Sequence, residues 1–173
     1  MIQRLRVPLG FVIAAAVLYF ATPTSESIAV GFPIAIIGAV FRGLAAGVIR
    51  KDAKLATNGV YGWTRNPLYF GSSLLALGFA VMSLNAISAI LLLLPSAFIY
   101  PNVITGEEAH LQELFPEEFP AYAQQVPRFF PRFRSSEPQF SFRQYLNNRE
   151  YNTALGLIAA LAVFVVKSVS PGN

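Results

Sequence analysis

The sequence predicts an all-α fold, a polytopic membrane helix bundle of about five transmembrane helices. The composition is the first indication, because 54% of the 173 residues are hydrophobic and only 13% are charged, whereas a soluble domain usually carries about 25% charged residues. The distribution is the second, because the apolar residues gather in stretches close to the roughly 17–25 residues that a spanning helix needs.

Five stretches are the expected spans. The first begins after Arg4 and Arg6, as a signal peptide does, but further spans follow at once and no A-x-A-like cleavage site closes the run, so we expect it to be retained. The first and third are short, which a thinned bilayer or flanking residues can accommodate. The expected spans are residues 7–21, 28–49, 68–83, 86–104 and 153–169.

Basic residues alternate between the loops, which predicts the orientation. The loops after the first and third spans have none, and Lys167 near the end of the last span can snorkel to the interface. We therefore expect the N-terminus and the polar segments to be cytoplasmic and the C-terminus to be outside. The residues on the expected cytoplasmic side are Arg4, Arg6, Arg50, Lys51, Lys54, Arg65, Arg128, Arg132, Arg134, Arg143 and Arg149.

Composition also limits the kinds of site. The chain has no cysteine and a single histidine, His110, so we expect no disulfide, no thiolate chemistry and no metal site. The net charge of +4 lies beside apolar spans, which favours anionic lipid headgroups as partners and argues against nucleic acid. We divide the chain into N-terminal spans (1–51), a core with the chemistry-bearing residues (52–134), and an interfacial segment with the last span (135–173).

The second span contains two features of interest. Gly43 and Gly47 have the spacing that lets helices approach closely, and packing within the monomer is favoured over a dimer face; the oligomeric state stays open. Arg42 either snorkels or belongs to the site. In the fourth span we expect a kink at Pro95.

The third and fourth spans form a tight hairpin that brings two polar segments together. Ionisable residues in a membrane protein are functional candidates, so Arg65 and the pair Glu107 and Glu108 stand out. Adjacent carboxylates on a helix point to different sides, so we expect at most one to face the site and the other to pair with Lys54 or solvent. The alternatives are that Arg65 is only a topology anchor and that Gly59 and Gly62 form an ordinary turn.

After the fourth span, apolar residues recur at spacings of three or four, which predicts a helix lying over the bundle. Pro116 and Pro120 divide it into two pieces. Residues 140–151 mix aromatics with arginines and are expected to form an amphipathic interfacial helix. The recurring apolar residues of the helix expected after the fourth span are Leu111, Leu114, Phe115, Phe119 and Tyr122.

The two polar segments resemble one family. Residues 59–71, GVYGWTRNPLYFG, are similar to the Gly-x-Tyr-x-x-x-Arg-His-Pro-x-Tyr-x-Gly signature of the isoprenylcysteine carboxyl methyltransferase and phospholipid methyltransferase family. Glu107-Glu108-x-x-Leu111 and the residues up to Pro131 resemble the second motif of that family. The resemblance covers residues 52–131, and the two motifs occur in order with a helical hairpin between them.

The resemblance implies an integral membrane enzyme that transfers a methyl group from S-adenosylmethionine to a lipidic or amphiphilic acceptor at the cytoplasmic face of the membrane. It implies that Arg65 and Glu108 act near the transfer. Methyl transfer is an in-line displacement, so positioning and desolvation matter most. The residues implied to line the cofactor are Lys54, Leu55, Ala56, Tyr61, Asn66, Pro67, Leu68, Tyr69 and Glu107.

The chain departs from the family pattern at two places. Asn66 replaces the family histidine, and asparagine can form hydrogen bonds but cannot titrate. Residues 102–105 hold no basic residue before the Glu-Glu pair, which leaves the acceptor open. The alternatives are carboxyl O-methylation of a prenylcysteine-like substrate as against N-methylation of a phospholipid, a membrane reductase with a nicotinamide cofactor, and a non-enzymatic membrane subunit.

Overall fold

The computed structural model describes residues 2–137 and 139–170, with side chains described at residue 10 and from residue 12 onward. The described residues form helices and no strand, which confirms the all-α class. The elements are α1 (Ile2–Phe20), α2 (Ser25–Ala46), the 3-10 turn η1 (Gly59–Gly62), α3 (Pro67–Ser83), α4 (Ala86–Leu94), the π-helical turn η2 (Pro95–Ile99), α5 (Tyr100–Leu114), α6 (Glu118–Gln125), α7 (Phe142–Asn147) and α8 (Tyr151–Val169).

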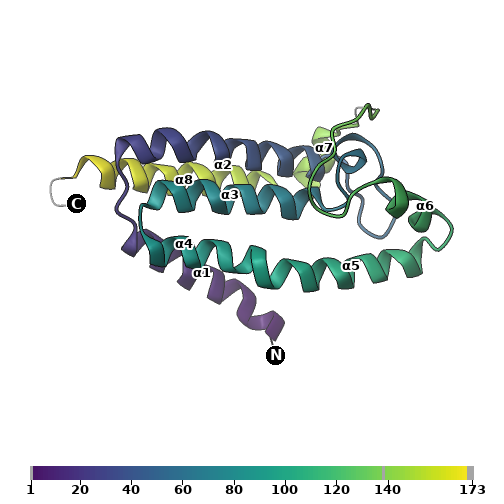
Figure 1. The fold of residues 1–173 in the computed structure, drawn as a ribbon, viewed down its shortest axis with the longest axis horizontal. Helices are drawn as coiled ribbons and strands as arrows, with labels where there is room; N and C mark the ends of the chain where they lie inside the picture. Colours follow the sequence, from purple (N-terminus) through teal and green to yellow (C-terminus); the bar gives the residue numbers. More distant parts are fainter. Residues whose placement is uncertain (1, 138, 171–173) are drawn as a thin grey trace.

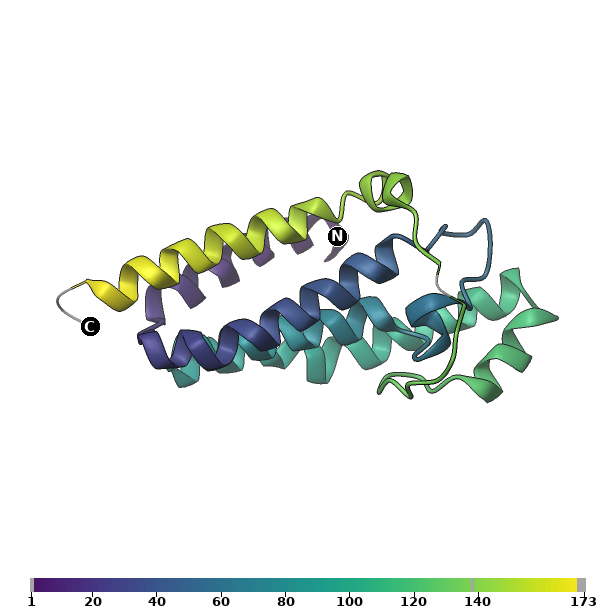
Figure 2. The same ribbon diagram turned by 90° about the horizontal axis from the view of Figure 1, so that it is seen from above.

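The long helices lie lengthwise, and the polar segments gather at one end of the bundle (Figure 1). α2 packs along α3, and the continuous helix α4–η2–α5 follows α3 back toward the polar end. The turned view shows α8 in a second layer, on the same side as α1 (Figure 2). The α2–α3 loop, α6 and α7 therefore meet at the end where α2 finishes and α3 begins.

Three helical stretches of the described chain are long and apolar enough to cross a membrane: Ser25–Ala46, Ala86–Leu114 and Tyr151–Val169. Pro67–Ser83 is apolar but shorter, as expected. The first expected span falls in α1, where several side chains lie outside the described part. The helix of the fourth span runs past the expected end at residue 104 to Leu114, and so carries Glu107 and Glu108 on α5. At Pro95, where a kink was expected, it contains a π-helical turn.

Glycines bring α2 and α3 into backbone contact. A Cβ on Gly38 would lie 2.6 Å from the Gly71 carbonyl oxygen, and one on Gly78 would lie 2.6 Å from the Ala35 nitrogen. The expected pair Gly43 and Gly47 does not make this contact. These two glycines face Tyr145 and Phe140 of the later chain instead.

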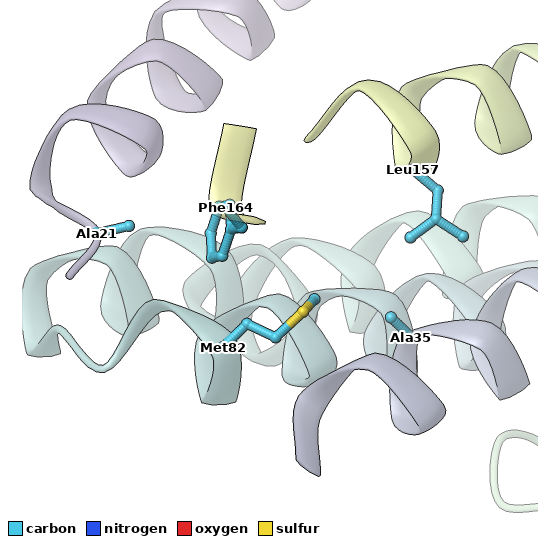
Figure 3. Packing of buried hydrophobic residues seen from close by; sticks show 5 residues of the cluster. All are labelled: Ala21, Ala35, Met82, Leu157 and Phe164. Atoms are coloured by element: carbon cyan, nitrogen blue, oxygen red, sulfur yellow. The ribbon is translucent and has the colours of Figure 1, made fainter. Parts of the chain in front are cut away.

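Two apolar clusters hold the ends of the bundle. Near the end away from the polar segments, Phe164 of α8 is fully buried with Met82 of α3 and Ala35 of α2 (Figure 3). At the polar end Leu55 packs with Phe119 and Tyr122 of α6. This second cluster fixes the α2–α3 loop against α6.

Of the three expectations about the chain after the fourth span, one is confirmed, one is confirmed in part and one is wrong in length. The helix does break into two pieces, α5 and α6, and four of its five expected apolar residues join the second cluster. Leu114 does not, because it ends α5 and is 40% exposed. The expected helix over 140–151 is wrong in length: α7 ends at Asn147, and Arg149 with φ of 54° turns the chain into α8.

Candidate active site

The α2–α3 loop is shaped by an extended segment that lies across it, residues 127–137 and 139–141, which we call the strap. The backbone of Arg65 donates to the Pro127 oxygen at 2.9 Å, and that of Arg132 donates to the Trp63 oxygen at 2.9 Å. Buried Thr64 adds a hydrogen bond from its hydroxyl to the Phe129 oxygen at 2.8 Å. The strap thus fixes the backbone just before α3.

The two glycines of the loop make room for this strap. Gly59 has φ of +60°, which suits glycine, and donates to the Glu137 oxygen at 3.0 Å. A Cβ on Gly62 would lie 2.5 Å from the Ser136 hydroxyl. The space that these two glycines leave open is therefore filled by the strap of the same chain.

A pocket of about 260 Å³ opens between this loop, the end of α5 and α6. Most of the expected site residues line it: Lys54, Leu55, Ala56, Tyr61, Arg65, Asn66, Glu107 and Glu108. The pocket is also lined by eight residues that were not expected to belong to the site: Ile49, Arg50, Lys51, Asp52, His110, Leu111, Phe119 and Tyr122.

Three of the expected cofactor residues do not line the pocket. Pro67 is fully buried as the first residue of α3, and Leu68 packs against the cluster that includes Val60 and Tyr61. Tyr69 lies behind the pocket wall, where its hydroxyl donates to Glu107 Oε1 at 2.6 Å. These residues support the wall, and only Tyr69 reaches a lining side chain through a hydrogen bond.

Both glutamates of α5 line the pocket, so the expectation that at most one would face it is wrong. The pocket wraps around the helix, and side chains on two neighbouring sides can therefore reach it. Glu107 is exposed and accepts a hydrogen bond from Tyr69. Glu108 is half-buried and pairs with residues other than Lys54.

Glu108 lies between two guanidinium groups. Its Oε1 is 3.2 Å from Arg65 Nε, and its Oε2 is 3.0 Å from Arg128 Nε. Arg128 also donates to Thr105 Oγ1 at 2.7 Å. Asn66 Nδ2 donates to Glu108 Oε1 at 3.2 Å and to the Arg128 oxygen at 2.9 Å. We call Glu108, Arg65 and Arg128 the pocket cluster.

Arg65 is incompletely hydrogen-bonded. Its Nη1 donates to the Ala123 oxygen at 3.2 Å. Its Nε is buried and, although close to Glu108, makes no hydrogen bond with the described residues. An unsatisfied buried donor beside a pocket costs free energy that an incoming acceptor can recover.

Two buried tyrosines form the floor of the pocket. Tyr122 donates its hydroxyl to the Tyr61 backbone oxygen at 2.8 Å. Burial raises the pKa of both phenols above their ordinary value of 10, and the nearby Arg65 only partly opposes this for the pKa of Tyr122. Both hydroxyl groups are therefore protonated at neutral pH, and the Tyr122 hydroxyl is the donor in this hydrogen bond.

Arg42 is neither a snorkelling residue nor part of this pocket. Its Nε and Nη2 donate to the two carboxylate oxygens of Glu150 at 2.8 and 2.9 Å. It also donates to Ser72 Oγ at 2.5 Å and Thr153 Oγ1 at 3.3 Å. Arg42 therefore ties α2 to α3 and to the beginning of α8; Glu150 was not anticipated as its partner, because it lies 108 residues away in sequence.

The pocket combines charges of both signs with apolar surface. Glu107 offers a carboxylate, Arg65 and Lys54 offer cations, and Leu55 and Phe119 offer apolar contact. Such a lining suits a small molecule that has an ammonium and a carboxylate at one end and a flat apolar ring at the other. Two more lining residues contact each other, with His110 Nε2 lying 3.2 Å from Asp52 Oδ1.

Comparison with known proteins gives one family. The phospholipid methyltransferase family model matches residues 9–118. Similar curated proteins include the nickel-cobalt-cadmium resistance protein NccN of Alcaligenes xylosoxydans xylosoxydans, 33% identical over 61% of this chain and 49% of that protein. The protein-S-isoprenylcysteine O-methyltransferase of Schizosaccharomyces pombe is 33% identical over 54% of this chain and 40% of its own.

A third relative, protein-S-isoprenylcysteine O-methyltransferase B of Arabidopsis thaliana, is 37% identical over 48% of this chain and 43% of its own. The chain thus spans about half the length of these curated relatives. No solved structure matches the chain significantly.

Proposed function

Because the chain belongs to the phospholipid methyltransferase family, we propose that it is an integral membrane methyltransferase that transfers a methyl group from S-adenosylmethionine to a carboxylate on a lipidic or amphiphilic acceptor. One observation supports this most. The pocket joins Asn66 with Glu108, 42 residues apart in sequence, and surrounds them with the lining described above.

The side chains of the pocket fit S-adenosylmethionine. Glu107 would hold the ammonium of its methionine part, and Lys54 would hold its carboxylate. Leu55, Phe119 and the wall around them would take the adenine ring. When bound, the cofactor supplies an electrophilic methyl group on a sulfonium; the protein's part is to position the acceptor and exclude water.

The pocket cluster favours a carboxylate acceptor over an amine. An amine must lose a proton, and Glu108 is the carboxylate next to the expected transfer. Each of its two carboxylate oxygens already pairs with a guanidinium group, Oε1 with Arg65 at 3.2 Å and Oε2 with Arg128 at 3.0 Å. A carboxylate acceptor needs no base, and the net positive cluster attracts it. The relatives from Schizosaccharomyces pombe and Arabidopsis thaliana are O-methyltransferases by name.

The orientation is part of the proposal. We place the N-terminus, the pocket and the strap on the cytoplasmic side, and the C-terminus outside, from the alternation of basic residues between loops. Reporter fusions near Asn58 and after the last helix should report opposite sides of the membrane. Fusions that report the same side would overturn the orientation.

Cofactor choice is tested by thermal unfolding of the detergent-solubilised protein. S-adenosylhomocysteine should raise the melting temperature, because a ligand bound only to the folded state stabilises it, by about 2.7 kcal/mol at a concentration of a hundred times Kd. A shift with a nicotinamide cofactor and none with S-adenosylhomocysteine would favour the reductase instead.

Acceptor chemistry is tested with methyl-labelled S-adenosylmethionine and two amphiphiles that share one apolar tail, one ending in a carboxylate and one in an amine. The carboxylate amphiphile should become labelled, and mild base should release the label as methanol, because an ester hydrolyses whereas an N-methyl group does not. Label that survives base on the amine amphiphile would show an N-methyltransferase.

A further inference from the structure

The strap and the first residues of α7 expose several large aromatic side chains. Phe130 is 76% exposed, Phe133 72%, and Phe142 64%. Each has one ring neighbour: Phe129 for Phe130, Trp63 for Phe133, and Tyr145 for Phe142. A group of exposed aromatic rings of this size in one segment indicates an interaction surface.

The backbone that carries these rings is fixed. Hydrogen bonds tie the strap to the α2–α3 loop at Trp63 and Arg65, and Ser141 donates to the Gly47 oxygen at 2.9 Å. The rings are thus held outward by an ordered segment. Their outer faces have no partner among the described residues of the chain.

The arginines of the same segment divide into two kinds. Arg128 and Arg134 turn inward: Arg128 pairs with Glu108, and Arg134 Nε donates to the Gly62 oxygen at 3.0 Å. Arg132 and Arg143 are exposed, and their side chains make no hydrogen bond or ion pair with the described part of the chain. The second kind is available to an external anion.

We propose that the strap and α7, which lie on two sides of the polar end of the bundle (Figure 2), each dock anionic phospholipids, with the exposed phenylalanines in the headgroup–acyl boundary and Arg132 and Arg143 on the lipid phosphates. Charge complementarity supports this occupant, since residues 128–146 contain four arginines and one glutamate. Position supports it too: α2 ends at Ala46 and α8 begins at Tyr151 beside this segment, so the surface lies where these spans leave the bilayer (Figure 1).

The test uses the full chain in phosphatidylcholine nanodiscs that contain a trace of phospholipid brominated near the headgroup end of its acyl chain. Phe130→Trp places a fluorophore on the surface, and the parent, with its single tryptophan, gives the background. Phe98→Trp is the matched control, because Phe98 is 68% exposed on the membrane-spanning helix. Each protein is compared with brominated phosphatidylglycerol and with brominated phosphatidylcholine.

In the Phe130→Trp protein, brominated phosphatidylglycerol should quench the added fluorescence as strongly as brominated phosphatidylcholine does at about five times the concentration. The reason is that one arginine near the surface favours an anionic lipid by about that factor. Quenching at position 98 should be equal for the two lipids. In the background of Arg132→Gln with Arg143→Gln, the preference at position 130 should disappear.

Equal quenching by both lipids at position 130 would overturn the proposal, as would a preference that survives the double glutamine variant. No quenching there would show that the surface faces water or a second copy of the chain, and it would overturn the proposal as well. None of these outcomes depends on the methyltransferase reaction.

Discussion

The molecule contains two arginine–glutamate clusters, one inside the bundle and one at the pocket. In the interior cluster, Arg42 meets Glu150 through two hydrogen bonds and donates two more, to Ser72 and Thr153. In the pocket cluster, the single carboxylate of Glu108 pairs with the guanidinium groups of both Arg65 and Arg128. Arg65 Nε makes no hydrogen bond with the described residues.

The difference lies in saturation and in charge balance. The interior pair is neutral and satisfied, as a buried ion pair must be if it is to be tolerated. The pocket cluster carries an excess positive charge and an unsatisfied donor, and it borders a cavity. Incomplete pairing beside a pocket, and not the presence of charge in a membrane protein, is what distinguishes the functional candidate here.

Breaking the interior cluster should have the largest effect on stability. Glu150→Ala leaves the Arg42 guanidinium buried without its counter-charge, and we expect the free energy of unfolding to fall by about 3–5 kcal/mol. Thermal unfolding in detergent measures this. Arg42→Met combined with Glu150→Met should recover most of the loss, because an apolar pair of similar volume has no unpaired charge. A double variant as unstable as Glu150→Ala would contradict this account.

Removing Arg65 from the pocket cluster should affect turnover more than stability. If Arg65 holds the acceptor carboxylate near the transfer, Arg65→Ala should lower kcat about 10²–10³-fold, the usual loss for a positioned charge-stabilising donor. Its affinity for S-adenosylhomocysteine should change much less. Arg65→Lys keeps the charge but not the planar fork, so it should restore turnover only in part. Loss of cofactor affinity with unchanged kcat would move Arg65 to the cofactor end of the pocket.

Glu107 lies next to the pocket cluster but outside its ion pairs. Glu107→Gln should weaken S-adenosylhomocysteine binding by about 1.5–3 kcal/mol, the value of a hydrogen bond to a charged group. Isothermal titration calorimetry measures this. Tyr69→Phe is the matched control: it removes the donor to Glu107, keeps the carboxylate, and should cost only about 0.5–1.5 kcal/mol. Unchanged binding by the glutamine variant would leave Glu107 as a helix-end charge.

The tyrosine floor should give the smallest effect, visible only in alkali. The pKa values of the Tyr61 and Tyr122 phenols are raised in the folded protein, so the unfolded chain loses these protons first once the pH passes the ordinary value of 10. The contribution of these two tyrosines to the free energy of unfolding should be constant below pH 10. Above pH 10 it should fall by about 1.4 kcal/mol per pH unit for each tyrosine. In the Tyr122→Phe variant the free energy of unfolding should fall less steeply with pH than in the parent. An equal slope in the two proteins would exclude Tyr122 as a cause of the alkaline loss of stability.

The sequence predicted the helical class, the hairpin and half of the pocket lining, because these follow from apolar periodicity and from a motif with fixed spacing. It did not predict which groups compensate each other. Glu150 lies far along the chain from its partner Arg42, and Arg128 reaches Glu108 from the strap; no local pattern pairs these residues.

The glycine prediction is met only in part: Gly43 and Gly47 pack within the monomer, but against Tyr145 and Phe140 and not against a spanning helix. Gly43 and Gly47 have the favourable spacing, but the helix contact is made by Gly31 and Gly38, which match glycines of α3 across the interface. Spacing within one helix does not show where a second helix crosses it. Spacing along α5 likewise did not show that both of its carboxylates line the pocket, together with Phe119 and Tyr122 of α6.

The arginine in α2 also has a consequence for biogenesis. Arg42 enters the membrane with the second helix, and Ser72 follows soon after, 30 residues later. Its counter-charge, Glu150, is synthesised only 108 residues later, just before the last helix. Until then the insertion machinery or the lipid headgroups must shelter an uncompensated cation. A ribosome-stalled chain that ends before Glu150 should therefore remain associated with the translocon longer than the same chain with the Arg42→Leu substitution.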